Sequence, residues 1–380
     1  MSFVYPLPTT GSISFADYLL DTDNKYLNDI SEATALRGRV RAVLKESART
    51  EGPKDYTNIM KTVDDYLPYL FAIVDCIEGG QLKLKKEFEA SWRCSLSDSV
   101  LKKKPRVICR DIYYELIFTL LTYGFACSDW ASSIVQRQES DTKLKQAADL
   151  LCRAAGIFAF IAEQVCPRWN NPPASRPPDV LIEMATSISK IALADASSIA
   201  IRKALMSQTS SSLLAKLSIG VAGHYEKANG LIKSLKDPQK VCGDFRKYVS
   251  YGALFHQALG KKFLAKDAYE HQETGKAVGF IRDAKEALHQ LSKSKSTIIA
   301  SRASQEHAEV VGLYTNYVKT NETIAFENVP TKEDLQALIP GGRVALDLTR
   351  YTPPVPRFGP GLENIDNKED DNYILKGRYY

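Results

Sequence analysis

The residues that most often carry chemistry are scattered along this chain one at a time. None of its five histidines forms an HExxH pair or lies at ligand spacing from a cysteine, as a zinc site requires (His224, His256, His271, His289 and His307). We interpret them as surface histidines or as packed core histidines. The seven cysteines are also single, without a CxxC pair. The sequence therefore predicts no metal site and no cofactor.

Motifs for nucleotide binding and for nucleophilic catalysis are missing as well. The sequence contains no Walker A loop, no GxGxxG turn and no GxSxG elbow. Gly220 and Gly223 lie within a helical pattern, where close packing between helices is a better explanation than phosphate binding. Asp64 and Asp65 are adjacent carboxylates, but neighbours in sequence do not face one another on a helix. We therefore expect a protein that is not an enzyme.

The composition indicates a soluble globular protein. Of the 380 residues, 44% are hydrophobic and 25% are charged, which argues against extensive disorder. The formal net charge of +5 is too small to indicate a nucleic-acid partner. The most apolar stretch, Ile112 to Ala126, is too short to span a membrane and contains Glu115. The unpaired cysteines and an N-terminus without a basic, apolar leader predict a cytoplasmic location.

Helical periodicity recurs through most of the chain. Leu181, Met184, Ile188 and Ile191 follow one another at three- and four-residue steps, the spacing of one buried face of a helix. A serine at 211 or 212 can cap the start of the next helix. The pattern predicts helices over about 56–76, 111–136, 142–166, 181–206, from 211, 241–269, 275–291 and 296–319. The predicted fold class is therefore mainly all-α.

Two regions depart from this pattern. The first 30 residues contain extended pieces such as Phe3-Val4-Tyr5, which are compatible with a short N-terminal β-hairpin. From Asn328 the chain is rich in proline and glycine but keeps apolar side chains, so we expect an extended segment across the helical body. We assign residues 1–350 to one domain and 351–380 to a short flexible tail. Residues beyond about Thr352 are expected to be dispensable for folding.

Helices near the C-terminal end show the spacing of small and large residues found in tetratricopeptide repeats. Glu273 to Ala284 resembles a second repeat helix, with Tyr251 to Tyr269 as its partner. One such pair cannot bury its apolar face alone, so neighbouring pairs should stack into a curved solenoid. A plain helical hairpin would give nearly the same spacing, and the sequence leaves both explanations open.

Two short segments are candidates for contacts outside the chain. Residues 353–356 form a PxxP sequence, a ligand type for SH3 domains, although a rigid extended tail explains it more simply. Lys102-Lys103-Lys104 could contribute to weak contact with an anionic membrane. Lysines of this kind are more often only solvated, so both segments are secondary candidates.

Several segments resemble the BRO domain family of ALIX-like proteins. Residues 249–288 are similar to the tetratricopeptide-like core of that family, and Ala154 to Glu163 resembles an earlier helix. "LADA" at 193–196 and "LAKL" at 214–217 keep the family's spacing, and "NETIAFENVP" at 321–330 followed by "IPGGR" resembles its extended return segment. The resemblance covers roughly residues 1–350. It implies a BRO domain, a curved helical solenoid with a tetratricopeptide-like core.

Within that family, "DDYLPYLFAI" at 64–73 and Trp92-Arg93 are most similar to the fungal pH-response regulators. The resemblance implies a non-enzymatic adaptor in alkaline-pH signalling, a pathway that leads to proteolytic processing of a zinc-finger transcription factor. The implied partners are the C-terminal amphipathic helix of the Snf-type ESCRT-III subunit and other pH-signalling components at the plasma-membrane cortex or on endosomes. A general endosomal-sorting or cargo scaffold without a pH role is the alternative.

The resemblance also implies where that partner helix binds. In BRO domains an apolar patch receives it, and the spacing places Ala200, Leu213 and Leu217 at the matching positions, with Ile201 beside the first. The sequence departs from the family pattern at Ala200, where a bulky aromatic residue is common, so the patch is shallower here or Ile201 compensates. The alternative is that Leu213 and Leu217 are simply core residues on one face of an amphipathic helix.

Overall fold

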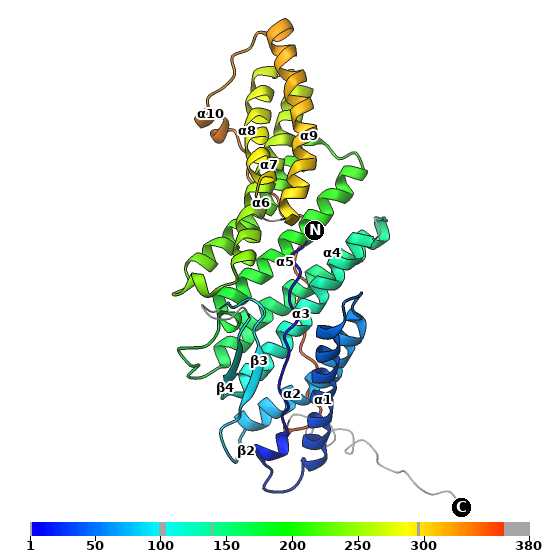
Figure 1. Cartoon of the computed structure of the whole chain (residues 1–380), viewed down its shortest axis with the longest axis vertical. Coiled ribbons are helices and arrows are strands. Elements are labelled where there is room, and N and C mark those ends of the chain that lie inside the picture. The colour runs from blue at the N-terminus through cyan, green and yellow to red at the C-terminus, as the bar shows by residue number, and fades with distance from the viewer. Residues whose placement is uncertain (1, 99–103, 138–139, 295–296, 361–380) are drawn as a thin grey trace, which may run out of the picture.

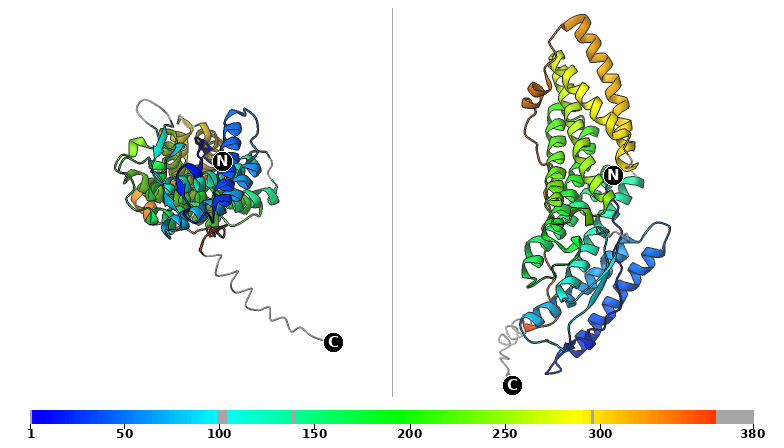
Figure 2. Two further views of the ribbon diagram at one scale, coloured as in Figure 1. Left: turned by 90° about the horizontal axis from the view of Figure 1, so that it is seen from below. Right: turned by 60° about the vertical axis from the view of Figure 1, so that its left-hand side comes forward.

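The computed structural model describes residues 2–98, 104–137, 140–294 and 297–360. Its helices form an elongated, curved stack in which each helix packs against the next along the chain (Figure 1, Figure 2). In chain order the helices are α1 (Leu27–Arg49), α2 (Tyr56–Glu78), α3 (Ile112–Arg137), α4 (Asp141–Phe160), α5 (Ile182–Met206), α6 (Ser211–Lys233), α7 (Gly243–Glu270), α8 (Thr274–Ser292), α9 (Thr297–Thr320) and the short α10 (Lys332–Ala337). The prediction of an all-α solenoid is confirmed.

Local sequence signals explain where these helices begin. Side chains at the N-cap position accept hydrogen bonds from the first turn in several of them, which satisfies backbone donors that have no helical partner. Asp55 does so for α2, Ser140 for α4 and Ser210 for α6. The serine cap of α6 therefore lies one residue before the predicted position. In the middle of the stack, α5 is rich in alanine and serine and is buried on most sides, because α4 and α6 pack on both flanks.

The N-terminal region differs from the prediction. Strand β1 (Leu19–Leu20) pairs with β2 (Lys83–Leu84), and β3 (Ala90–Arg93) forms an antiparallel hairpin with β4 (Arg106–Cys109). Residues 2–14 form no hairpin and instead run as an extended chain along the helices (Figure 1). The predicted N-terminal hairpin is wrong because the extended segments there pair with residues that are far away in the sequence. Thr10, for example, forms a β-bridge with Trp92. Helix α1 was not predicted.

A return segment, residues 326–358, runs back along the stack from the end of α9 toward α2 (Figure 2). Its backbone N–H groups donate to helix carbonyls at three levels: Arg343 to Lys216 at 2.8 Å, Thr349 to Cys152 at 3.1 Å, and Arg357 to Pro68 at 3.1 Å. The extended segment expected across the helical body is therefore present, and it crosses α6, α4 and α2 in turn.

Two helix glycines explain how the return segment approaches so closely. A Cβ atom on Gly156 would lie 1.8 Å from the carbonyl oxygen of Thr349, and one on Gly220 would lie 2.1 Å from that of Arg343. No side chain larger than hydrogen fits at either place. The prediction that Gly220 mediates helix-to-helix packing is wrong, because its neighbour is an extended backbone. Gly223 has nothing within 4 Å of the same position among the described residues.

Two aromatic residues of the predicted tail contact the helical body. Tyr351 packs its ring against Phe160 at a centroid distance of 5.1 Å. Phe358 is only 6% exposed and lies 5.2 Å from the ring of Tyr26. Tyr351 and Phe358 therefore pack on the body from either side of the proline-rich stretch, whereas Val355 between them is 70% exposed. The remainder of the predicted tail, 361–380, lies outside the described residues.

One helical run is long and apolar enough to cross a membrane by length and composition. Within the described residues it extends from Asp141 to Arg168, and 67% of its most apolar window is buried inside the fold. Burial of this extent is typical of a core helix in a soluble protein. The apolar stretch at Ile112 to Ala126 forms part of α3, where it is buried against the neighbouring helices.

Candidate partner-binding surface

Three helices come together around the predicted patch. Ser189 on α5 donates to the carbonyl of Ala155 on α4 at 2.9 Å, and Ser187 donates to that of Ala228 on α6 at 3.2 Å. Nearer the end of α5, Lys203 forms an ion pair with Asp141 at 2.9 Å. These contacts fix antiparallel neighbours, so the last turns of α5 lie beside the first turns of both α4 and α6.

The four predicted patch residues divide into two kinds. Ala200 and Leu213 are half-buried and reach the surface. Ile201 is 3% exposed and Leu217 is 9% exposed, so both contribute to the core between the helices. Ile201 therefore does not replace the missing aromatic side chain at Ala200 on the surface. Of the predicted set, Ala200 and Leu213 are the residues that a partner can reach.

Two exposed apolar residues enlarge this surface and were missed in the sequence. Leu205 is 47% exposed and Met206 is 61% exposed in the last turn of α5. They lie five and six residues beyond Ala200, and only residues 207–210 separate them from α6. We call Ala200, Leu205, Met206 and Leu213 the α5–α6 apolar surface. The sequence does contain a signal for Leu205, which follows Ile201 at a four-residue step. Periodicity alone, however, does not show which side of the helix is exposed to solvent.

A groove of about 400 Å³ lies along α4 at the same level of the stack. Leu150, 8% exposed, contributes an apolar base, and Lys145, Asp149 and Arg153 contribute charged side chains at its edge. A groove with an apolar base and charges of both signs at the rim suits an amphipathic helix better than a small metabolite.

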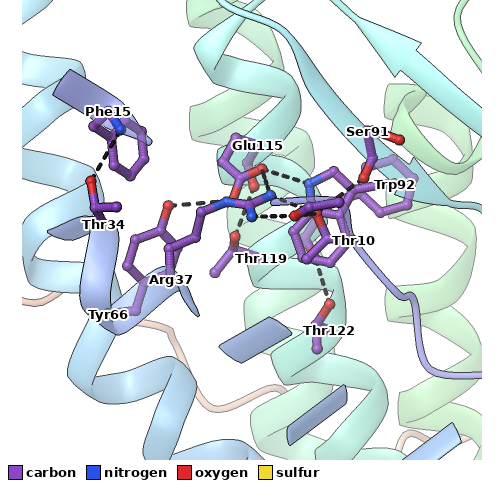
Figure 3. A network of polar contacts seen from close by, with 12 residues as sticks. Thr10, Phe15, Thr34, Arg37, Tyr66, Ser91, Trp92, Glu115, Thr119 and Thr122 are labelled. Atoms are coloured by element: carbon purple, nitrogen blue, oxygen red, sulfur yellow. Dashed lines mark hydrogen bonds and ion pairs between the residues drawn. The ribbon is translucent and has the colours of Figure 1, made fainter. Parts of the chain in front are cut away.

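A buried polar cluster in the N-terminal half has a different character (Figure 3). Arg37 of α1 donates from Nε to Oε1 of Glu115 at 2.9 Å, and Trp92 of β3 donates from Nε1 to Oε2 at 2.7 Å. Tyr66 of α2 also donates to Glu115, at 3.3 Å. The side chains of Arg37 and Glu115 are 1% and 0% exposed. A substrate cannot reach this cluster, so we assign it to the structure rather than to catalysis.

The charges of this cluster support one another. Burial by itself would lower the pKa of Arg37, but the carboxylate of Glu115 outweighs burial, and the pKa is raised. The pKa of Tyr66 is also raised well above its usual value, first by burial and then by the same carboxylate. The guanidinium therefore stays charged and the phenol stays neutral at physiological pH. The cluster joins α1, α2, α3 and the β3–β4 hairpin.

Comparison with known proteins identifies the family. The sequence profile of the BRO1-like domain matches residues 15–355. The chain belongs to the BRO1-like domain family.

Among curated proteins, this BRO1-like chain is similar to pH-response regulators named palC from three fungi. It is 26% identical to that of Cryptococcus neoformans over 100% of this chain and 99% of the relative. It is 23% identical to that of Yarrowia lipolytica over 100% of both chains. The protein of Emericella nidulans is 22% identical over 93% of this chain and 90% of its own length.

Solved structures share the fold. The BRO1 domain of ALIX in complex with CHMP4C has a TM-score of 0.72 and 17% identity, covering 96% of this chain and 99% of that one. A longer ALIX chain bound to a viral late-domain peptide has a TM-score of 0.74 and 17% identity, covering 94% of this chain. The present chain spans 50% of that longer chain. At this identity the likeness establishes the fold alone.

The histidines of this BRO1-like domain lie apart from the α5–α6 apolar surface. His256 is 3% exposed and stacks on the ring of Tyr225 at 5.9 Å, and burial lowers its pKa well below the usual value. His289 of α8 and His307 of α9 approach within 5.1 Å, ring to ring. In the described parts of the chain no three His, Cys, Asp or Glu side chains gather as they would around a metal ion.

Proposed function

We propose that this chain is a non-enzymatic adaptor that acts in alkaline-pH signalling by binding an ESCRT-III subunit. Its partner is the C-terminal amphipathic helix of the Snf-type subunit, and its place of action is the plasma-membrane cortex or the endosome. Through this contact it promotes proteolytic processing of a zinc-finger transcription factor. Other pH-signalling components bind elsewhere on the same solenoid.

The observation that carries this proposal is similarity to three palC regulators along essentially the whole of both chains. The alignments span the solenoid from end to end, so the likeness extends beyond one repeat or motif. The complex of the ALIX BRO1 domain with CHMP4C supports the choice of partner, because the same fold there holds an ESCRT-III protein.

The α5–α6 apolar surface supplies a plausible contact for the partner helix. An amphipathic helix places apolar side chains at three- and four-residue steps along one face. Leu205, Met206 and Leu213 offer apolar contact to that face, and the half-buried Ala200 leaves room for a large side chain. Lys216 is exposed next to Leu213, so an acidic side chain flanking the apolar face of the ligand would be favoured.

Leu213→Asp is expected to weaken binding of the Snf-type C-terminal peptide by about tenfold or more. Burying one leucine contributes about 1.5–3 kcal/mol, and about 1.4 kcal/mol corresponds to a tenfold change in affinity. The carboxylate adds a desolvation cost against the apolar ligand. Affinity is measured by calorimetry, and the melting temperature should stay close to that of the unchanged protein because Leu213 is only half-buried.

Two further variants serve as controls for Leu213→Asp. Leu254→Asp changes a leucine of α7 that is 45% exposed and lies outside the α5–α6 apolar surface, so peptide affinity should be unchanged. Leu217→Asp buries a charge at a site that is 9% exposed and should lower the melting temperature instead. Unchanged affinity in Leu213→Asp, or equal loss in Leu254→Asp, would remove this surface from the proposal.

A general endosomal-sorting scaffold is the second candidate. It is favoured by similarity to BROX of Danio rerio, 22% identical over 73% of this chain, and by a structural neighbour described as a basis for endosomal targeting by the Bro1 domain. Deleting the gene in the source organism separates the two. The pH-signalling role predicts poor growth at alkaline pH with normal receptor sorting to the vacuole. A sorting defect with normal alkaline growth would favour the scaffold.

A further inference from the structure

The outer face of the β3–β4 hairpin carries an unusual pair of charges. Arg93 of β3 lies directly opposite Arg106 of β4 in the ladder, and both are exposed. The alternation of the strands turns Trp92 and Cys109 into the core and leaves these arginines, with Ile108 at 62% exposure, on the outside. Like charges directly opposite one another destabilise a β-ladder.

A third arginine, Arg41 of α1, lies near Arg106. Arg41 lies one helical turn beyond Arg37, which already contacts Thr10 beneath the hairpin. Arg41 is half-buried, and its Nε has no hydrogen-bond partner among the described residues. The charges of Arg93 and Arg41 both contribute to a lowered pKa of Arg106, after burial as the main cause. Arg93 and Arg41 are thus each close enough to Arg106 to act on its charge.

The protein holds Arg106 in place without neutralising it. Its guanidinium donates from Nη1 to the carbonyl of Ser91 at 3.3 Å and from Nη2 to Oγ1 of Thr9 at 3.2 Å. Both acceptors are uncharged. Within the part of the chain that the structure describes, no carboxylate lies within ion-pair distance of Arg41, Arg93 or Arg106. The side chain is fixed, and its charge remains available.

A neighbouring arginine shows that counter-charges could have been supplied. Arg110, just after β4, forms ion pairs with Glu87 at 2.9 Å and with Glu89 at 2.9 Å. The hairpin therefore contains one neutralised arginine and two, Arg93 and Arg106, that have no carboxylate partner among the described residues. Guanidinium groups bind phosphate oxygens in a two-pronged geometry, and a phosphate group can offer up to two negative charges to such a cluster.

We propose that Arg41, Arg93 and Arg106 form a binding site for a phosphate group. The group is a phosphomonoester or a polyphosphate, presented either by a soluble molecule or by a lipid headgroup. Each source would contribute the oxyanions that the three guanidinium groups lack.

Titration with inorganic pyrophosphate at low ionic strength tests the site directly. The unchanged protein should bind, and Arg93→Gln and Arg41→Gln should each weaken binding by about tenfold or more, because charge-assisted hydrogen bonds are lost. Arg110→Gln is the matched control, since it removes one charge from the same hairpin without touching the cluster. In the absence of ligand, Arg93→Gln should melt at the same or a higher temperature, because a repulsive pair is removed.

Vesicles distinguish the two sources of phosphate. Phosphatidylcholine vesicles containing phosphatidylinositol bisphosphate should sediment with the unchanged protein and not with Arg93→Gln if the group belongs to a lipid. Binding of pyrophosphate without binding of vesicles identifies a soluble phosphate. The proposal is overturned if the unchanged protein binds neither probe. It is equally overturned if Arg110→Gln weakens binding as much as Arg93→Gln does, because net charge alone would then explain the effect.

Discussion

Replacement of Glu115 by alanine is expected to lower the free energy of unfolding by about 3–5 kcal/mol. The carboxylate accepts hydrogen bonds from Arg37, Trp92 and Tyr66 in a site from which solvent is excluded. Its removal leaves a buried guanidinium without its counter-charge and an indole N–H without an acceptor. Denaturant unfolding monitored by circular dichroism measures the loss.

Two comparisons show whether burial is the cause. Arg168→Ala breaks ion pairs with Asp75 at 3.1 Å and with Glu78 at 2.5 Å, in which all three side chains are about 40% exposed, so its cost should be about 0–1 kcal/mol for each pair. The double change Arg37→Met with Glu115→Leu should recover part of the stability lost in Glu115→Ala, because no unpaired charge remains. A loss below about 1 kcal/mol in Glu115→Ala would contradict the view of this cluster as a structural joint.

A chain that ends at Thr352 is expected to be less stable than one that ends at Pro360 by about 1.5–3 kcal/mol or more. The shorter chain loses Phe358, whose ring packs against Tyr26 of the N-terminal region and Tyr69 of α2. Burial of a phenylalanine contributes about 1.5–3 kcal/mol. The backbone bond from Arg357 to Pro68 is lost as well. Thermal and denaturant unfolding of the two chains gives the difference.

Single substitutions show whether the loss of stability is due to the ring of Phe358. Phe358→Ala in the full chain should reproduce most of the loss. Val355→Ala should leave stability nearly unchanged, because Val355 is 70% exposed on the same segment. Equal stability of the two truncated chains would restore the boundary expected from the sequence, near Thr352.

Helix periodicity could be read from single segments because each helix carries its own signal. The steps from Leu181 to Ile191 predicted α5, and the serine near 211 predicted the start of α6. Helix α1 was not predicted because its buried residues include the charged Arg37, which weakens the apolar periodicity of this segment. The burial of a charged residue depends on a partner 78 positions away, which no local pattern records.

The candidate surface was predicted less completely than the fold. Spacing within the family predicted Ala200, Ile201, Leu213 and Leu217. It could not distinguish Ala200 and Leu213, which reach the surface, from Ile201 and Leu217, which are buried between the helices. An amphipathic pattern indicates one apolar face and leaves open whether core or partner covers it. Leu205 and Met206 belong to the exposed set because the neighbouring helices no longer cover the last turn of α5.

By itself, the sequence determined the helical class, the order of most helices and the resemblance to BRO domains, because these depend on periodicity and on motifs within short windows. Tertiary structure alone decided which extended segments pair and which glycines admit the return segment. It also brought Arg41 of α1 and Arg93 of β3 near Arg106 of β4. Such contacts join residues that are far apart in sequence. Their geometry is fixed only when the whole solenoid packs, and so no local pattern contains it.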